Sequence, residues 1–427
     1  MSMSSESRHA PIKSVLYVTS RFPALSATFI ANEMDALSQR GVDVHVGTVW
    51  SATGTHTGHD VELPFLEKVQ STRLTAPKTW IRVFRGLVQR PAVFLTVVRL
   101  IPGHLKSPWL LAKLIASAPK GIALGHWVSE QDIDWIHAHF LTSPTTVAML
   151  ASEVSGVPFS ATAHAFDITS QHPRRVNGSI VQKIQAMNLV VTISDFNRRD
   201  IHRRWPQLVD EPIEVIYNGI DTERFTPSAS HTPLARRPTQ LLSISNLNAK
   251  KGFDWLIRSM GVLRDRGSDA QLRIFGDGPD RAILQTLIQE LELTESVTLG
   301  GPVSQAQVQA LCQEADIYIL ASVPLHSDDA DGLPTVLIES LACALPTIST
   351  HVTGIPEIII DGTTGLCVPP RDPEAMADAI QRLIDDPMAA QAMANAGREL
   401  VLAQFDKHRS AKSLIDVWSN AITLAQH

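Results

Sequence analysis

The chain has 427 residues, more than one hydrophobic core usually organises, and this length predicts two domains of ordinary size. A hydrophobic content of 44% indicates a globular protein, no uncharged apolar run approaches the roughly 20 residues of a membrane span, and the first residues lack the apolar segment of a signal peptide. The net charge of −6 disfavours nucleic acid as a partner, and three cysteines without disulfide or metal-ligand spacing favour the reducing cytoplasm.

The first predicted elements form a βαβ unit. It consists of a strand at 14–19, a helix at 28–39 that stops at Gly41, and a strand at 42–49. Further apolar strands are expected at 135–138, 158–163, 189–193 and 213–217. Strands that alternate with helices predict a parallel sheet covered on both faces, so we expect residues 12–225 to form a doubly wound, Rossmann-like domain.

The stretch between the second and third of these strands is unusually basic. Residues 68–129 contain ten Lys and Arg, no Asp or Glu, and five Trp and Phe among many aliphatic residues, so the rest of the chain carries about −16. This mixture suits the headgroup zone of an anionic membrane. The alternative is a set of ordinary amphipathic helices that pack their apolar faces inward and leave the cations in water.

A second strand and helix series follows a linker at 226–239. Its strands are expected at 241–245, 272–275, 297–299, 317–320 and 346–349, within a second Rossmann-like domain at 240–405. A last helix at 409–424, within 408–427, is expected to return to the first domain. The sequence thus predicts an α/β protein with two doubly wound domains facing a central cleft, where ligands collect at the carboxyl ends of the strands.

Residues 331–346 contain the most informative motif. Gly332 lets a ligand approach the backbone, Pro334 suits a first helical turn, and the helix amides form an anion site. Asp331 lies just before this helix and Glu339 two turns into it, so their carboxylates are placed to reach different hydroxyls of one extended ligand. The spacing suits a nucleoside diphosphate sugar.

Histidines mark the ends of two strands in the first domain. His137 and His139 share one face of their strand, and His164 ends the next, so His139 and His164 are expected to line the same cleft. A metal on His137 and His139 is disfavoured because no cysteine or carboxylate lies near in sequence. Buried histidines with a structural role remain the alternative. A literal Asp-x-Asp occurs at Asp329 to Asp331, and its neighbours Asp328 and Asp329 are interpreted as a solvated loop rather than a metal site.

Several motifs occur in the order of a known family. Ser20-Arg21-Phe22-Pro23, Ser26-Ala27-Thr28-Phe29-Ile30, Lys251-Gly252, Gly276-Asp277-Gly278-Pro279 and the Asp331 to Glu339 pair resemble retaining glycosyltransferases of the large group 1, family 4 type. The similarity is closest to exopolysaccharide enzymes of the colanic acid and amylovoran kind, and it implies the two-domain GT-B architecture. Three positions depart from the family pattern: Ala27, Asn246 where Arg is common, and Asp331 where Glu is usual.

The resemblance also implies roles for single residues. The implied catalytic residues are His164, Lys251 and Asp331. The implied donor-binding residues are Asn246, Gly276, Val303, Gly332, Leu333 and Glu339. The implied acceptor-side and phosphate-loop residues are Arg21, Ser26, Thr28 and His139.

The expected reaction is transfer of a sugar from a nucleoside diphosphate sugar to a hydroxyl, with retention and without metal or cofactor. The expected acceptor is a saccharide or a polyprenyl-diphosphate-linked intermediate of polysaccharide synthesis, used on the inner face of the cytoplasmic membrane. Two alternatives stay open. One is a nucleotide-sugar epimerase or phosphorylase on the same fold, and the other is a non-catalytic binding partner.

Overall fold

The computed structural model describes residues 12–23, 28–50, 60–105, 107–169, 179–230, 232–234, 237–325 and 330–425. The chain divides into two compact units. Unit 1 comprises Met1–Ile193, Asn197–Tyr217 and His408–His427, and unit 2 comprises Ser194–Phe196 and Asn218–Lys407. Among the described residues no helix combines the length and the apolar character needed to cross a bilayer.

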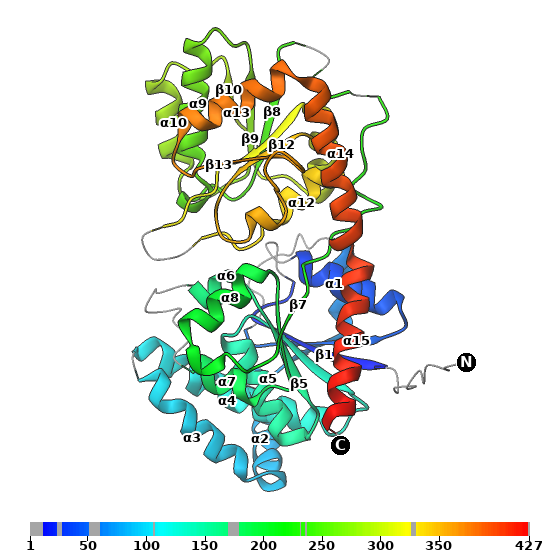
Figure 1. Ribbon diagram of the computed structural model, residues 1–427. Helices are drawn as coiled ribbons and strands as arrows, with labels where there is room; N and C mark the ends of the chain where they lie inside the picture. Colours follow the sequence, from blue (N-terminus) through cyan, green and yellow to red (C-terminus); the bar gives the residue numbers. More distant parts are fainter. Residues whose placement is uncertain are drawn as a thin grey trace, which may run out of the picture. The chain divides into compact units, whose positions relative to one another are not determined.

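Unit 1 is built on a seven-stranded sheet of order β3-β2-β1-β4-β5-β6-β7, and all of its strand pairs are parallel (Figure 1). Its elements are β1 (Ser14–Thr19), α1 (Thr28–Gln39), β2 (Asp43–Thr48), η1 (Asp60–Lys68), β3 (Val69–Ser71), α2 (Pro77–Gln89), α3 (Ala92–His104), α4 (Pro108–Val128), β4 (Trp135–His139), α5 (Ser143–Ser155), β5 (Phe159–Ala163), α6 (Ala165–Thr169), α7 (Ile180–Ala186), β6 (Leu189–Thr192), α8 (Asp195–Arg204), η2 (Pro206–Leu208), β7 (Ile213–Val215) and α15 (Lys407–Ala425).

Helices α1 and α15 cover one face of this sheet. Apolar residues of α1 recur at helical spacing, and Ile30, Met34 and Leu37 are buried. Leu414 and Trp418 of α15 join them in one hydrophobic cluster. The last helix therefore completes the core of the unit that begins the chain.

Helices α2, α3 and α4 form an additional layer. Helix α4 packs against α5, and α2 and α3 pack in turn against α4. The contact is close, because a Cβ at Gly125 of α4 would lie 2.7 Å from the carbonyl oxygen of Ala151 on α5. The α4 side of this layer is therefore packed tightly against α5 of unit 1.

Unit 2 has a six-stranded parallel sheet of order β10-β9-β8-β11-β12-β13. Its elements are β8 (Gln240–Ile244), η3 (Ala249–Lys251), α9 (Phe253–Asp265), β9 (Gln271–Phe275), α10 (Arg281–Glu290), β10 (Val297–Leu299), α11 (Gln305–Glu314), β11 (Ile317–Leu320), α12 (Thr335–Ala342), β12 (Thr347–Thr350), η4 (Ile355–Glu357), β13 (Leu366–Val368), α13 (Pro373–Asp385) and α14 (Pro387–Gln404). Asp372 and Asp386 each precede a proline and cap α13 and α14 through their carboxylates.

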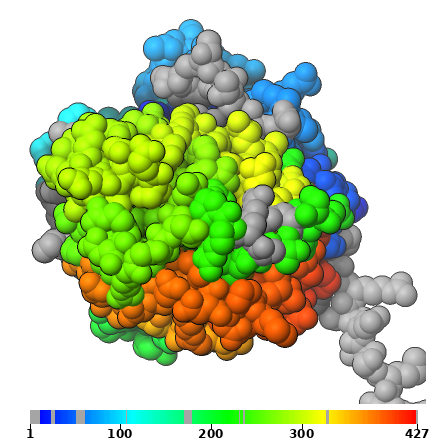
Figure 2. Space-filling view, turned by 90° about the horizontal axis from the view of Figure 1, so that it is seen from above, coloured from blue at the N-terminus to red at the C-terminus, as the bar shows by residue number. Residues whose placement is uncertain are grey.

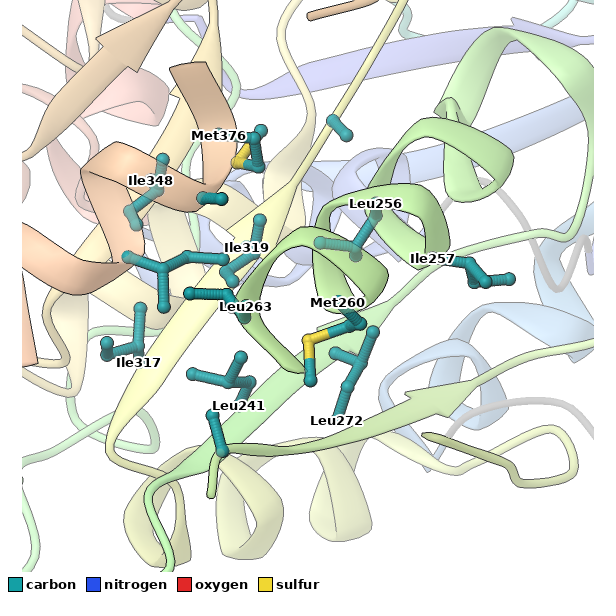
Figure 3. Packing of buried hydrophobic residues seen from close by; sticks show 14 of the residues in the cluster. Leu241, Leu256, Ile257, Met260, Leu263, Leu272, Ile317, Ile319, Ile348 and Met376 are labelled. Atoms are coloured by element: carbon teal, nitrogen blue, oxygen red, sulfur yellow. The ribbon is translucent and has the colours of Figure 1, made fainter. Parts of the chain in front are cut away.

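Helices cover both faces of this sheet. Helix α9 packs against α10 and α13, and α12 packs against α14. In Figure 2 residues of α13 and α14 form the orange surface, and the segment from α9 through α10 forms the yellow-green one. Figure 3 shows the core beneath α9, where Leu256 and Met260 meet Leu241, Leu272 and Ile319 of the strands.

The two predicted doubly wound sheets are confirmed. Strands β1, β10 and β11 and helix α1 have the predicted bounds, and the other predicted strands differ at their ends by one or two residues. Two strands were missed. Both β3 and β13 are only three residues long, too short for a periodic pattern to be recognised.

Candidate active site

The loops that follow β8, β9 and β11 in unit 2 meet through their backbones. Gly276, after β9, has φ of 141°, and a Cβ there would lie 1.9 Å from the carbonyl oxygen of Ser245. Gly252, near the end of the loop after β8, has φ of 63°, and its Cβ would lie 2.0 Å from the carbonyl oxygen of Ala321, after β11. Only glycine permits these contacts without displacement of the backbone.

The meeting point is the topological switch of the sheet. Strand β8 lies between β9, which follows it in the chain, and β11, which is reached after the excursion through β10. Ligands of open parallel sheets bind where the strand order reverses in this way. The loops after β8 and β11 also share a hydrogen bond, from the amide of Val323 to the carbonyl oxygen of Lys250.

Two predicted catalytic residues form an ion pair at this point. Lys251 Nζ lies 2.8 Å from Asp331 Oδ2, and Ser322 donates a hydrogen bond of 2.8 Å to the same oxygen. Lys250 Nζ lies 3.8 Å from Oδ1. Asp331 is 7% exposed, so its carboxylate is positioned by these partners. The resemblance implied catalytic roles for Lys251 and Asp331, and the structure makes them direct neighbours.

The segment after Asp331 presents unused backbone donors. Helix α12 begins at Thr335, and Pro334 precedes it with an extended ψ of 117°, so Pro334 is the residue before the helix rather than part of its first turn. In the described part of the chain, the amides of Gly332 and Leu333 donate no hydrogen bond, while the carbonyl oxygen of Gly332 accepts from Gly354. Such donors beside a helix start favour an anion.

Glu339 lies just over one turn into α12, rather than two. The residue is 6% exposed, and burial raises the pKa of its carboxyl to about 7, against the opposing effect of Arg224. A carboxyl in this state exchanges its proton near neutral pH. Glu339 therefore lies on the helix that begins just after the amides of Gly332 and Leu333.

The other predicted donor residues lie in the loops after β8, β9 and β10. Asn246 is exposed in the loop after β8, and Val303 is half-buried in the loop after β10. The amide of Gly276 donates to the carbonyl oxygen of Gly301, which links the loops after β9 and β10.

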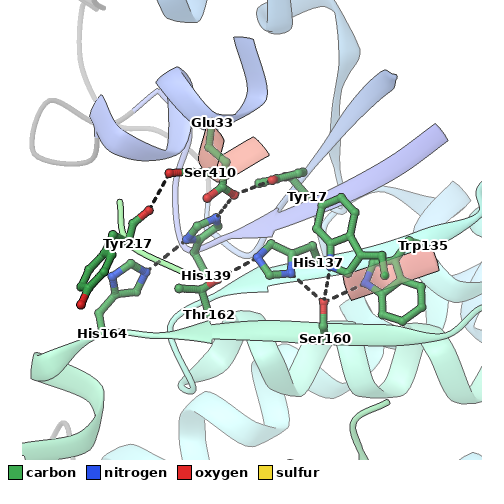
Figure 4. Close-up of polar contacts among 11 residues, drawn as sticks. Tyr17, Glu33, Trp135, His137, His139, Ser160, Thr162, His164, Tyr217 and Ser410 are labelled. Carbon is green, nitrogen blue, oxygen red and sulfur yellow. Dashed lines mark hydrogen bonds and ion pairs between the residues drawn. The ribbon is translucent and has the colours of Figure 1, made fainter. Parts of the chain in front are cut away.

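In unit 1 the predicted histidines belong to a buried polar cluster (Figure 4). Tyr17 donates a hydrogen bond of 2.5 Å to Glu33 Oε1, and His139 Nε2 lies 3.1 Å from the same oxygen. His139 Nδ1 lies 3.2 Å from His164 Nε2. His139 is fully buried and lies behind His164, which is 5% exposed. Burial and the neighbouring His139 lower the pKa of His164 well below its usual value, so His164 is neutral.

Asp167 joins the loops that carry these histidines. Its carboxylate accepts hydrogen bonds from the amides of His164 and Leu141, at 2.8 and 2.6 Å. The loop after β4 and the loop after β5 are therefore tied at one buried carboxyl. Because the Asp167 carboxylate binds the backbone amide of His164, it holds the His164 residue in place.

The remaining predicted residues lie elsewhere on unit 1 or outside the described ranges. Arg21 is exposed after β1, and Thr28 is the half-buried first residue of α1. Ser26, Asp328 and Asp329 lie outside the described residues.

Sequence reasoning missed Glu33. The signal was present, because Glu33 lies among the buried positions of α1, three residues after Ile30 and one before Met34. A charged residue on an apolar helix face needs a buried partner. Together with His137 and His139 it also forms the one group among the described residues whose donor atoms are close enough for a metal ion. Both nitrogens of His137 already contact hydroxyls, Ser160 Oγ at 2.7 Å and Thr162 Oγ1 at 2.9 Å.

Comparisons with known proteins agree with this geometry. Residues 26–224 match the family described as Glycosyltransferase Family 4, and residues 229–400 match Glycosyl transferases group 1. The amylovoran biosynthesis glycosyltransferase AmsK of Erwinia amylovora is 26% identical over 94% of this chain and 98% of its own. The alpha-D-kanosaminyltransferase of Streptomyces kanamyceticus is 30% identical over 66% of this chain and 76% of its own.

A solved structure shares the fold. Anabaena Alr3699/HepE, in complex with UDP, has a TM-score of 0.68 and 16% identity, with 96% of this chain and 100% of that chain covered. Both halves of the chain thus match the same class of enzyme, and the chain belongs to the group 1, family 4 glycosyltransferases, with two Rossmann-like domains of the GT-B type.

Proposed function

We propose that the chain transfers a sugar from a nucleoside diphosphate sugar to a hydroxyl of a polysaccharide precursor, with retention of anomeric configuration and without a metal. One observation carries this proposal. At the switch point of unit 2, Lys251 is held by Asp331 beside the amides of Gly332 and Leu333, which donate to none of the described residues. An ammonium group retains two further donors when one contacts a carboxylate, and amides add fixed dipoles, which together suit a diphosphate.

The proposed step stabilises the leaving group. The bond between the anomeric carbon and the diphosphate oxygen breaks, and the acceptor oxygen bonds to the same face of that carbon. The acceptor proton passes to a diphosphate oxygen. Lys251 and the two amides offset the negative charge that develops on the diphosphate, which is the main electrostatic demand of the step. His164 contacts the transferred sugar, Asp331 a sugar hydroxyl and Glu339 the ribose.

The relatives support the substrate class. AmsK carries the name of an amylovoran biosynthesis enzyme, and HepE was solved with UDP. We infer a nucleoside diphosphate sugar as donor, and a saccharide or a polyprenyl-diphosphate-linked saccharide as acceptor.

An assay of nucleoside diphosphate release tests this proposal. The protein is incubated with UDP-, GDP-, ADP- and dTDP-sugars, with and without lipid-linked acceptors, in the presence and absence of a chelator. We expect release that depends on the acceptor and persists with the chelator, and a product of unchanged anomeric configuration by NMR. An epimerase would convert the donor alone, a phosphorylase would require phosphate, and a binding partner would bind without turnover. Each of these results contradicts the proposal.

We further propose that the layer of α2, α3 and α4 binds the surface of an anionic membrane. Ten of the eighteen exposed large hydrophobic residues in the described chain lie between Trp80 and Ile115, and Trp80, Phe84 and Val88 form one stripe of α2. The inner face of α2 is also apolar, with Val83 buried. Arg73, Lys78, Arg85, Arg90 and Arg99 are exposed around the stripe, and no acidic residue lies between 68 and 129. An outward apolar stripe with a purely cationic border matches anionic lipid.

Vesicle flotation tests the membrane proposal with a matched pair of variants. Phe84 and Ile283 are 68% and 67% exposed, but Ile283 lies on α10 in unit 2. We expect Phe84→Ala to weaken binding to phosphatidylglycerol-containing vesicles by about tenfold, since the lost side chain buries apolar area in the interface, and Ile283→Ala to have no effect. Added salt should weaken binding of the wild type. Equal responses of the two variants, or equal binding to neutral vesicles, would contradict this assignment.

A further inference from the structure

The hydrogen-bond partners in the polar cluster of unit 1 restrict where its protons can lie. Glu33 Oε1 is a carboxylate oxygen and accepts only, so Tyr17 and His139 Nε2 must both donate to it. A neutral His139 that donates from Nε2 has an unprotonated Nδ1. That nitrogen then accepts from His164 Nε2, and the proton of the neutral His164 imidazole lies on Nε2.

The remaining nitrogen of His164 is consequently an acceptor. Its ring packs against Phe29 and Phe140, with centroid distances of 5.0 and 4.3 Å. Within the described ranges Nδ1 of His164 has no hydrogen-bond partner, and the residue keeps 5% of its surface exposed. A lone pair in such apolar surroundings is a strong and specific acceptor for a ligand hydroxyl.

We propose that Glu33 and His139 are positioning residues that hold His164 in the Nε2-protonated tautomer, so that Nδ1 accepts a hydrogen bond from a hydroxyl of the transferred sugar. The sugar contact of His164 rests on the proposed function. The order of donors and acceptors from Tyr17 through Glu33 to His164 does not, and it can be measured separately.

A second chain of hydrogen bonds, around His137 on β4, provides an internal reference. Ser160 Oγ accepts from the indole nitrogens of Trp135 and Trp418, at 2.7 and 3.2 Å, so it donates its own proton to His137 Nδ1. His137 then donates from Nε2 to Thr162. This tautomer depends on Ser160 and not on Glu33, so His137 should be insensitive to changes at Glu33.

Nitrogen NMR of histidine-labelled protein tests the tautomer directly, with a chelator present to keep metals off the cluster. In the wild type we expect His164 to show a protonated Nε2 and a bare Nδ1. Glu33→Leu removes the oxygen that accepts from His139 Nε2, so the Nε2-protonated form of His139 is no longer favoured. His139 and His164 should then exchange between tautomers, and the His164 signals should move away from those of a purely Nε2-protonated ring. The His137 signals should stay unchanged. A wild-type His164 protonated on Nδ1, as a doubly protonated His139 would require, overturns the proposal.

Kinetics then test the positioning role. We expect Glu33→Leu to lower kcat/KM for the sugar donor by about tenfold or more, because part of the protein then presents a protonated His164 Nδ1 where an acceptor is needed, while affinity for the free nucleoside diphosphate stays within about twofold. Tyr17→Phe removes the other hydrogen bond to the same oxygen but keeps the bonds from Glu33 through His139 to His164, so its kcat/KM should stay within about threefold of wild type.

Equal losses in Glu33→Leu and Tyr17→Phe, or a parallel loss of nucleotide affinity, would indicate a structural role only and overturn the proposal. If Glu33→Leu fails to fold, the wild-type spectrum still decides the tautomer, and His139→Phe tests the role, since it removes the acceptor for His164 Nε2 and should release the fixed tautomer. A wild-type protein without transfer activity would reject the proposed function but leave the tautomer result standing. A tautomer change without a kinetic effect would reject the positioning role alone.

Discussion

The polar cluster of unit 1 and the loop cluster of unit 2 hold their groups by different means. In unit 1, side chains from β1, α1, β4 and β5 are buried and bind one another through hydrogen bonds. In unit 2, backbone contacts at Gly252 and Gly276 bring the loops together, and one ion pair fixes Lys251. The first arrangement brings polar side chains within hydrogen-bond distance of one another, and the second brings together a charge and backbone donors. Substitutions should therefore affect sugar recognition in unit 1 and diphosphate stabilisation or loop geometry in unit 2.

The largest expected effect is that of Lys251→Ala. The change removes a cation from the proposed leaving-group site and leaves the buried Asp331 with its contacts to Ser322 and the more distant Lys250. We expect turnover to fall by about a hundredfold or more, the usual consequence of losing one stabilising donor in a transition state. Rapid-quench measurement of nucleoside diphosphate formation gives the rate of this step.

Lys250→Ala is the matched control, because Lys250 lies 3.8 Å from the other Asp331 oxygen and its side chain is 25% exposed. Its effect should stay below about tenfold. Equal losses for the two lysines would show that this loop contributes only general positive charge.

Glu339→Gln should change the pH dependence of stability. Burial raises the pKa of this carboxyl from 4.5 to about 7 in the folded protein, so the folded state holds the proton more tightly than the unfolded chain. The contribution of Glu339 to the free energy of unfolding is therefore fully present below about pH 4.5 and is lost as the pH rises towards 7.

The variant should match the wild type near pH 4 and exceed its stability at pH 8 by about 3 kcal/mol at most, measured by hydrogen exchange of peptides from α12. A constant difference between the two proteins from pH 4 to pH 8 would contradict the raised pKa.

Gly276→Ala tests the backbone contacts of unit 2. Its φ of 141° and the 1.9 Å approach to Ser245 leave no room for a methyl group, so we expect a loss of more than about 1 kcal/mol in local stability, seen in hydrogen exchange of β8 and β9. Gly261→Ala is the control, since Gly261 lies in α9 with no atom within 4 Å of its Cβ position. That change should stabilise the helix by about 0.5–1 kcal/mol. Loss of stability in both variants would argue against a specific role for Gly276.

Much of this arrangement was predictable from the sequence, and the missed part has a physical reason. Buried strands separated by helices predict parallel sheets, and parallel sheets bring the ends of their strands to one edge, which places Lys251, Gly276 and Asp331 in neighbouring loops. The ion pair between Lys251 and Asp331 joins residues eighty positions apart, and no local pattern reports it. Glu33 and His139 are farther apart still, although the carboxyl on the apolar face of α1 signalled a buried partner.

The indole of Trp418 has a consequence for how the protein is made. It stacks on Trp135, bonds to Ser160 in the middle strands of unit 1, and is fully buried, yet it belongs to α15. Domains near the start of a chain generally fold first during synthesis, but the core of unit 1 includes this late helix. One face of its sheet lacks the cover of α15 until that helix has been made, and by then the residues of unit 2 have been made.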